Sequence, residues 1–214
     1  MQGLTARLSK GLFSRGALPA ATVKATFARG RWKGKRGGQR RGSAVDAQLT
    51  TLANGSRRKA TSPKLLCLTQ SALDAFKQRG YRLVCGQRGV ASDRHSLGTA
   101  LDLICIDQDN VLVLVELKCG YDGDRMRPVL YRGKVQHFKP PLGRVVDCAY
   151  HRHIAQSAIG GYLFGTETKL RHDLESHGIT NTRSEVCYVN DAGVEFVDVD
   201  AWWLNKVPSL LKVM

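Results

Sequence analysis

The hydrophobic and polar positions of this chain are organised around one segment, residues 98–120. Two apolar runs, 100–106 and 111–118, flank the polar triplet Gln108-Asp109-Asn110, a pattern typical of a β-hairpin that turns at the triplet. The mixture of helical and strand-like patterns elsewhere predicts an α/β domain. The other predicted elements are helices over 68–79, 147–164 and 201–213, a strand over 81–85, a polar loop over 86–98, and a second hairpin formed by 184–189 and 194–199.

Three charged residues interrupt the apolar runs of the central hairpin: Asp102, Glu116 and Lys118. If the turn is centred on Asp109, residues that face each other have numbers that sum to 218, which places Asp102 opposite Glu116. Directly paired residues project to the same face of a sheet, with Cβ atoms about 5 Å apart. Lys118 lies two residues beyond Glu116 and therefore shares this face. The pattern predicts two carboxylates and one amine together inside an apolar sheet.

Two adjacent carboxylates in a sheet need a compensating charge. A buried carboxylate is costly unless it is paired or binds a metal, and one lysine relieves the repulsion between two carboxylates only in part. A divalent cation resolves the conflict, since Mg²⁺ is typically held by one or two carboxylates together with waters and a substrate phosphate. The alternative is a salt bridge of Lys118 with Glu116 or Asp102 on a solvated face.

The spacing of these residues resembles the core of the PD-(D/E)XK nucleases. The resemblance is carried by Asp102, then thirteen residues, then Glu116-Leu117-Lys118 at the end of an apolar strand. It implies a restriction-endonuclease-like core with a mixed central sheet flanked by helices. It also implies that Asp102, Glu116 and the Leu117 carbonyl bind Mg²⁺, with Mn²⁺ as an alternative cation, and that Lys118 positions the attacking water.

The helix predicted after the central hairpin carries His153 and Gln156, three residues apart. A His-x-x-Gln pair on this helix is similar to the corresponding helix of RecB-type exonucleases, which implies that Gln156 helps to hold the substrate strand and makes His153 a further site candidate. The tyrosine expected four residues after the glutamine is replaced by Gly160, and Tyr162 is the nearest substitute.

Two further features of the family have no clear counterpart in this chain. Some exonuclease relatives carry a histidine upstream of the first acid, and His95 is the candidate for this position. Many members place an additional acid on the first core helix. No glutamate precedes Glu116, so the sequence leaves only Asp74 or Asp93 for this role.

Positive charge is concentrated in the N-terminal part of the chain. The net charge is +15 in total, of which residues 1–64 contribute +14. This asymmetry predicts three regions: a basic, disordered arm or targeting segment over 1–42, a short helix and linker over 43–63, and the nuclease-like domain over 64–214. The residues expected to contact nucleic acid are Arg29, Arg31, Trp32, Lys33, Lys35, Arg36, Arg40 and Arg41 of the arm, and Arg125 and Arg127 of the cation-rich segment 120–146.

The arm leaves several roles open. Residues 1–28 contain no acid and have weak helical spacing of leucines, which is typical of a mitochondrial transit peptide or of a plain basic arm. A nuclear-localisation signal fits residues 29–42 equally well. The six cysteines form no C-x-x-C pair and are expected to be reduced in an intracellular protein, and no apolar stretch approaches a membrane span.

These patterns and the family resemblance together predict a metal-dependent deoxyribonuclease that acts in DNA repair, recombination or replication. The resemblance to RecB-type enzymes favours an exonuclease, and the sequence leaves exonuclease and endonuclease action open. RNA remains open as a substrate, and so does the oligomeric state. The alternative from another class is a non-catalytic protein that binds or packages nucleic acid on a nuclease-like scaffold, which the basic arm fits directly.

Overall fold

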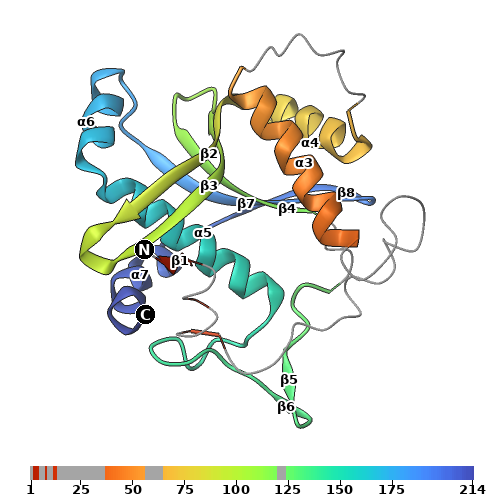
Figure 1. Ribbon diagram of the computed structural model, residues 1–214, viewed down its shortest axis with the longest axis vertical. Helices are drawn as coiled ribbons and strands as arrows, with labels where there is room; N and C mark the ends of the chain where they lie inside the picture. The colour runs from red at the N-terminus through yellow and green to blue at the C-terminus, as the bar shows by residue number, and fades with distance from the viewer. Residues whose placement is uncertain (1, 5–7, 9–11, 14–36, 56–64, 120–123) are drawn as a thin grey trace.

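The computed structural model describes residues 2–4, 8, 12–13, 37–55, 65–119 and 124–214. In these ranges the chain forms a mixed α/β structure whose central sheet is flanked by helices (Figure 1). The elements in chain order are β1 Gln2–Gly3, α3 Gly37–Ala53, α4 Cys67–Gln78, β2 Arg82–Ser92, a short 3₁₀ helix Asp93–His95, β3 Leu97–Ile106, β4 Leu112–Cys119, β5 Leu130–Tyr131, β6 Lys134–Val135, α5 Ala149–Thr166, α6 Thr168–Ser176, β7 Thr182–Asn190, β8 Gly193–Asp198 and α7 Ala201–Val213.

The central sheet is built around β3 and β4. These strands are antiparallel, and the register of their four pairs, from Leu103 with Val115 to Ile106 with Leu112, is the one predicted from the turn at Asp109. On its other edge β4 pairs with β7 in parallel, after the crossover through α5 and α6, and β8 completes this side of the sheet as the antiparallel partner of β7.

Beyond Leu103, strand β3 separates from β4. Its free edge next pairs with β1 at Leu97 and Gly98, and β2 covers the opposite edge along the whole strand. A gap in the pairing of β3 therefore opens between Gly98 and Leu103, and Asp102 lies in this gap.

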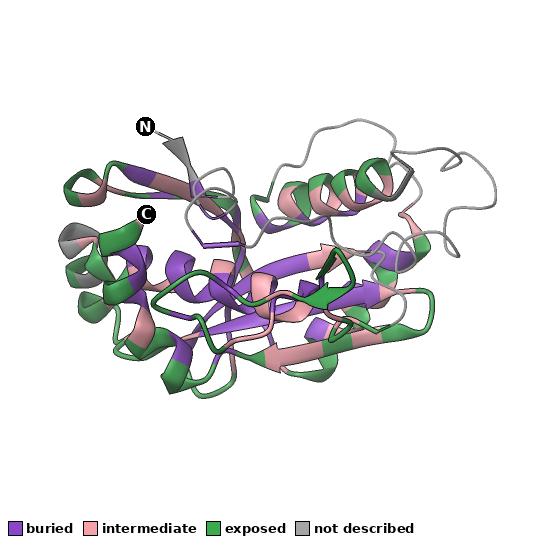
Figure 2. Cartoon of the chain, turned by 90° about the horizontal axis from the view of Figure 1, so that it is seen from below, coloured by how far each residue is buried: buried purple, intermediate pink, exposed green. Residues whose placement is uncertain are grey.

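Two apolar clusters enclose the sheet. On one face α3 and α4 pack against residues such as Leu103, Val113 and Val115. On the other face α5 and α7 pack against residues such as Ile104, Leu112 and Leu114. Figure 2 shows the buried strands between these two layers of helices. The alternation of β4 directs the side chains of Glu116 and Lys118 towards α5, because they continue the series of Leu112 and Leu114.

The N-terminal segment differs from the predicted arm where it is described. Leu4, Leu8, Leu12 and Phe13 are buried in the cluster that contains α5 and α7. The leucine spacing that suggested a transit peptide thus supplies apolar side chains to the core. The short helix expected within residues 43–63 begins at Gly37, so that it carries Arg40 and Arg41 of the predicted arm on its first turns.

Local structure differs from the prediction in two further places. Strand β2 continues to Ser92 where a loop over 86–98 was expected, because β3 is long enough to pair with it as far as Leu97. Asp147 does not cap α5: Cys148 precedes the helix, and the buried Asp147 carboxylate accepts hydrogen bonds from Arg152. The helix predicted over 201–213 is present as α7, and Asp200 caps it, since its side chain accepts a hydrogen bond from the Trp203 amide.

All six cysteines are free thiols. None of the helices in the described part of the chain combines the length and the apolar content that a bilayer-spanning segment requires.

Candidate active site

The side chain of Asp102 accepts a backbone hydrogen bond at the point where the pairing of β3 with β4 ends. The ladder between β3 and β4 ends at Leu103 and Val115, one step before Asp102 would face Glu116. The Asp102 carboxylate oxygen Oδ2 accepts a hydrogen bond from the Leu117 amide over 2.8 Å. The N–H and C=O of one residue point to the same side of a strand, so the Leu117 carbonyl faces this gap as well. The predicted neighbourhood of Asp102 and Glu116 is therefore present, although it arises from a side-chain contact and not from a direct strand pair.

Strand β3 changes its facing at the same residue. Leu101 packs in the cluster that contains α5, whereas Leu103, two residues further on, packs against α3 and α4. In a regular strand these two side chains would share a face. The irregularity places the Asp102 carboxylate at the boundary between the two faces, where groups from both layers of helices can reach it.

Lys118 connects Glu116 to helix α5. Its ammonium group forms an ion pair with the Glu116 carboxylate and lies 3.3 Å from the amide oxygen Oε1 of Gln156. Glu116 is only 6% exposed and the Lys118 side chain only 16% exposed, so this is an ion pair within the fold and not on a solvated face. Three of the residues predicted from separate sequence motifs thus form one connected group.

The environment of Glu116 favours its neutral form. Burial raises the pKa of Glu116 to about 7, against the lowering effect of the Lys118 ammonium, and the negative charge of Asp102 raises it further. A carboxyl group with this pKa is partly protonated at neutral pH. A cation that displaced the proton would bind most strongly above this pH.

Asp46 is a third carboxylate at this site, and it was not among the residues selected from the sequence. It lies on α3, and the side-chain amide of Gln87 donates to both of its carboxylate oxygens at 3.0 and 3.1 Å. The same amide nitrogen lies 3.2 Å from Oδ1 of Asp102, so Gln87 bridges the two acids. Burial raises the pKa of Asp46, and the charge of Asp102 contributes in the same direction.

The two acids that the sequence offered for the additional position lie elsewhere. Asp74 is on α4, where its carboxylate accepts a hydrogen bond from Gln70 at the surface. Asp93 begins the 3₁₀ helix at the far end of the β2–β3 hairpin. A signal for Asp46 was present in the sequence, because it is the one acid within residues 1–64 and sits on a predicted amphipathic helix.

His153 is buried beside the site in a neutral form. Burial lowers the pKa of this imidazole well below its usual value, and the nearby cations Lys118, Arg125 and Arg152 lower it further. Its Nδ1 atom lies 3.1 Å from the hydroxyl group of Tyr188, the residue that pairs with Lys118 across β4 and β7. The side chain therefore contributes packing and a hydrogen bond next to Lys118, and it carries no positive charge.

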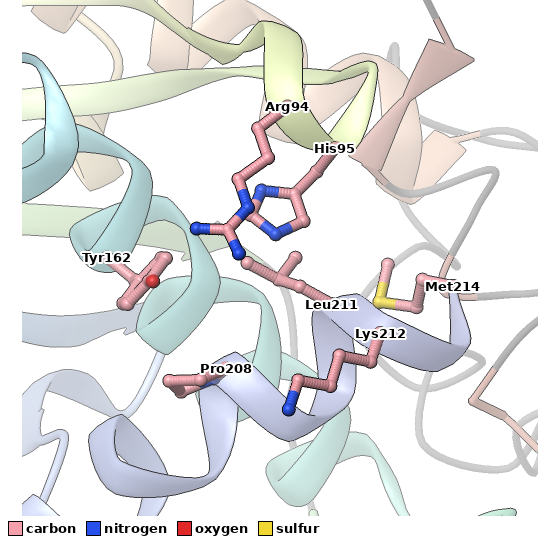
Figure 3. A pocket seen from close by; sticks show the side chains of 7 residues that line it. All are labelled: Arg94, His95, Tyr162, Pro208, Leu211, Lys212 and Met214. Atoms are coloured by element: carbon pink, nitrogen blue, oxygen red, sulfur yellow. The ribbon is translucent and has the colours of Figure 1, made fainter.

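His95 and Tyr162 come together, but away from the carboxylates. Both line a separate surface pocket of about 410 Å³ together with Arg94 and residues of α7 (Figure 3). His95 ends the 3₁₀ helix before β3, and Asp102 lies a further five residues along the strand from Leu97, about 17 Å. Tyr162 is six residues beyond Gln156, which is about 9 Å along α5 and on another side of the helix. The structure thus does not bring these two candidates to Asp102 and Glu116.

The structure describes only some of the residues that were predicted to contact nucleic acid. Arg29, Arg31, Trp32, Lys33, Lys35 and Arg36 lie outside the described residues. On α3, Arg40 is exposed and Arg41 pairs with Asp191. Arg125 pairs with Glu195 and stacks on the Tyr188 ring, with 3.9 Å between the guanidinium carbon and the ring centroid, whereas Arg127 is exposed.

The donor set is compatible with a divalent cation of the Mg²⁺ type. Within the described ranges, no group of three or more His, Cys, Asp and Glu side chains is placed so that it could hold a metal ion. Mg²⁺ does not require one, since it commonly binds one or two carboxylates and keeps several waters. Asp46, Asp102 and Glu116 supply only oxygen ligands, and Lys118 alone does not balance their three potential negative charges. By the chemistry of their donors, one or two of these carboxylates suit a hydrated cation of this type.

No protein-family model and no curated protein matches the chain. Among solved structures, the chain is similar to the crystal structure of a protein from Eubacterium rectale that is described as a "putative exonuclease". The similarity has a TM-score of 0.41 and 10% sequence identity, and it covers 80% of this chain and 63% of the other. The chain thus spans less than two thirds of the length of that protein.

Proposed function

We propose that this protein is a metal-dependent deoxyribonuclease with a PD-(D/E)XK core, and that it hydrolyses DNA phosphodiester bonds. One observation carries the proposal: the Lys118 ammonium contacts both Glu116 and Gln156, while Asp102 accepts a hydrogen bond from the Leu117 amide between them. An acid, an acid-x-lysine strand and a glutamine on the following helix are thereby gathered at one place.

Asp102, Glu116 and the Leu117 carbonyl would hold the cation, with Asp46 as a further acid. Mg²⁺ or Mn²⁺ bound by these groups would lower the pKa of a water molecule and stabilise negative charge on the scissile phosphate. The Leu117 carbonyl suits this role because it faces the gap beside Asp102, where the β3–β4 ladder has ended.

The remaining residues act on the substrate. Lys118 carries a positive charge next to the acids, where it can donate a hydrogen bond to the attacking water or to a phosphate oxygen. Gln156 fixes the position of Lys118 and has an amide group to donate to the DNA strand. His153 and Tyr188 support Lys118 from the buried side. Tyr188 is the strand partner of Lys118, and its hydroxyl group is the hydrogen-bond partner of His153.

The pairing of Gln156 with His153 on α5 supports an enzyme of the exonuclease type, and the cations of residues 29–41 supply affinity for the DNA backbone. Such an enzyme would serve DNA repair, recombination or replication. RNA has the same phosphodiester chemistry and is included as a substrate in the test below.

The second candidate is a protein that binds or packages nucleic acid without cleaving it. It is favoured by the ion pair of Glu116 with Lys118, which stabilises the fold without any metal. This second candidate does not explain why Asp46 lies near Asp102, because two like charges that share one hydrogen-bond donor destabilise each other.

A cleavage assay separates the two candidates. The full chain is incubated with end-labelled single-stranded DNA, double-stranded DNA and RNA, in Mg²⁺, in Mn²⁺ and in EDTA. We expect cleavage of DNA that requires the metal, is lost in Lys118→Ala and Glu116→Gln, and is unchanged in Lys77→Ala, which removes an exposed lysine of α4. Binding of DNA without cleavage in either metal would establish the second candidate.

A further inference from the structure

Strands β5 and β6 form a small hairpin that projects from the body of the molecule (Figure 1). Its two-residue turn has positive φ angles at Arg132, 51°, and at Gly133, 74°. Two consecutive residues with positive φ are the mark of a type I′ turn, which matches the twist of the strands and gives a hairpin a defined shape. The tip therefore presents its side chains in a fixed arrangement.

The hairpin exposes apolar side chains to an unusual extent. Leu130, Tyr131 and Val135 are 54%, 44% and 45% exposed, and Met126, which precedes the hairpin, is 52% exposed. Four large apolar side chains lie exposed within ten residues: the paired Leu130 and Val135 share one face of the hairpin, and Tyr131 lies on the other face beside its partner Lys134. Exposed apolar groups gathered in this way indicate a surface that is covered by a partner.

The base of the hairpin is fixed to the core. Val129, which precedes the hairpin, is fully buried. Its amide donates a hydrogen bond to the Asp147 carbonyl over 2.7 Å, and its carbonyl accepts one from the Gln136 amide over 2.9 Å. The buried side chain of Asp147 is in turn held by Arg152 of α5. The stem of the hairpin is thus tied to α5 through Asp147 and Arg152.

The same segment begins and ends at the candidate active site. It follows β4, which carries Glu116 and Lys118, and leads into α5, which carries Gln156. Near its start, Arg125 stacks on Tyr188, the strand partner of Lys118. The hairpin thus lies in the stretch of chain that joins the two elements carrying the candidate site.

The charges of the hairpin select the partner. Arg127, Arg132 and Lys134 lie on or beside it, and the Arg132 guanidinium is 5.4 Å from the centre of the Tyr131 ring. Cations beside an exposed aromatic ring suit an unpaired nucleic-acid strand, because phosphates contact the cations while a base stacks on the ring. A protein partner of mixed charge would not require this excess of positive charge.

We propose that the β5–β6 hairpin binds an unpaired stretch of the DNA strand, with a base stacked on Tyr131 and the neighbouring phosphates at Arg132 and Lys134. This proposal rests on the proposed deoxyribonuclease function for the identity of the nucleic acid. It goes beyond that function by assigning the contact that distinguishes single-stranded from double-stranded substrate, since a base inside a duplex cannot stack on a side chain without leaving its pair.

The test measures binding in EDTA, where no cleavage occurs, by fluorescence anisotropy of a labelled oligo-dT and of a duplex of equal length. Tyr131→Ala should weaken binding of oligo-dT about tenfold, and Tyr131→Phe should leave it within about twofold of the unmodified protein. Arg132→Gln combined with Lys134→Gln should reduce the slope of log affinity against log salt by about 1.4. Trp202→Ala is the matched control, because Trp202 is 46% exposed on α7, and it should not change binding.

Unchanged binding in Tyr131→Ala, or an equal loss in Trp202→Ala, would overturn the proposal. So would a loss that is as large for the duplex as for oligo-dT. The outcome is separate from the cleavage assay. Cleavage that depends on Lys118 together with unchanged binding in Tyr131→Ala refutes the hairpin alone, whereas selective loss of oligo-dT binding without any cleavage supports the hairpin and refutes the enzyme.

Discussion

The Asp102 carboxylate accepts a hydrogen bond from the backbone amide of Leu117 at the point where β3 parts from β4. In a continued ladder the carbonyl of residue 101 would take this bond. Here the Asp102 oxygen Oδ2 replaces that carbonyl as the acceptor, so the other carboxylate oxygen, Oδ1, remains open to further contacts. The Leu117 carbonyl is also released from pairing with β3. The irregularity in the sheet thereby creates an oxygen-lined position next to Glu116.

Asp102→Asn should separate stability from activity. An amide oxygen can still accept the Leu117 hydrogen bond, and the variant removes one of the repelling negative charges, so the free energy of unfolding in metal-free buffer should rise by up to about 1 kcal/mol. Cleavage should fall by more than about 100-fold, because a ligand to the cation is lost. Urea denaturation in EDTA and single-turnover cleavage in Mg²⁺ measure the two effects. A clear drop in metal-free stability would indicate that Asp102 serves the fold.

Asp46→Asn tests the acid that lies on α3. If Asp46 is a ligand or orients one, cleavage should fall by about 10- to 100-fold and the Mg²⁺ concentration for half-maximal activity should rise. Asp74→Asn is the matched control, since Asp74 is a surface aspartate on α4 bound to Gln70, and its activity should remain unchanged. Equal activity of the two variants would remove Asp46 from the site.

Lys118→Ala should destabilise the protein in a pH-dependent way. The substitution leaves the Glu116 carboxylate buried without its cation, which costs about 3 kcal/mol when Glu116 is charged. The loss should be smaller at pH 5, where Glu116 is protonated in the folded state because burial raises its pKa to about 7. The double variant Lys118→Ala, Glu116→Gln should recover most of the stability at pH 8. Equal losses at both pH values would mean that the effect comes from packing and not from charge.

Glu116 itself should make metal-free stability decrease as pH rises. Its pKa is about 7 in the folded protein because of burial, above the ordinary value of 4.5, so the folded state binds more protons between these limits. The stabilisation from the retained proton is present below pH 4.5 and is lost as the pH rises through 7, with an upper limit of about 3 kcal/mol. The difference in unfolding free energy between the unmodified protein and Glu116→Gln, measured in EDTA from pH 4 to about 8, should show this slope. A flat difference would contradict the raised pKa.

Gln87→Ala should impair the site without unfolding the protein. The Gln87 side chain is exposed, so the free energy of unfolding should change by less than about 1 kcal/mol. Its amide holds Asp46 and Asp102 in fixed orientations, and its loss should raise the Mg²⁺ concentration needed for activity by about tenfold. Gln87→Glu should be more damaging than Gln87→Ala, because a third carboxylate would replace the shared donor. Arg88→Ala, at the next position of β2, serves as the control.

The local pattern of the sequence was sufficient to predict the central hairpin and its register. The turn at Asp109 fixes the numbers of facing residues, and strand alternation then fixes the faces, so the contact of Glu116 with Lys118 and the proximity of Asp102 follow from positions close together in the chain. These predictions succeed because hydrogen bonding within a hairpin and side-chain periodicity are local properties. Gln156 was selected through a family resemblance, and its contact with Lys118 depends on how α5 packs against the sheet.

Tertiary structure decided the rest of the site. Asp46 reaches Asp102 because α3 docks on the sheet, and Gln87, which joins them, is 41 residues away from Asp46 in the chain. Likewise, Leu4, Leu8 and Leu12 resemble a targeting helix in isolation and are buried only because α5 and α7 provide an apolar surface. No periodicity encodes these contacts, since they depend on how separate elements pack. The sequence determined the Asp102, Glu116 and Lys118 group, and only the folded chain selected its third acid and moved His95 and Tyr162 away from it.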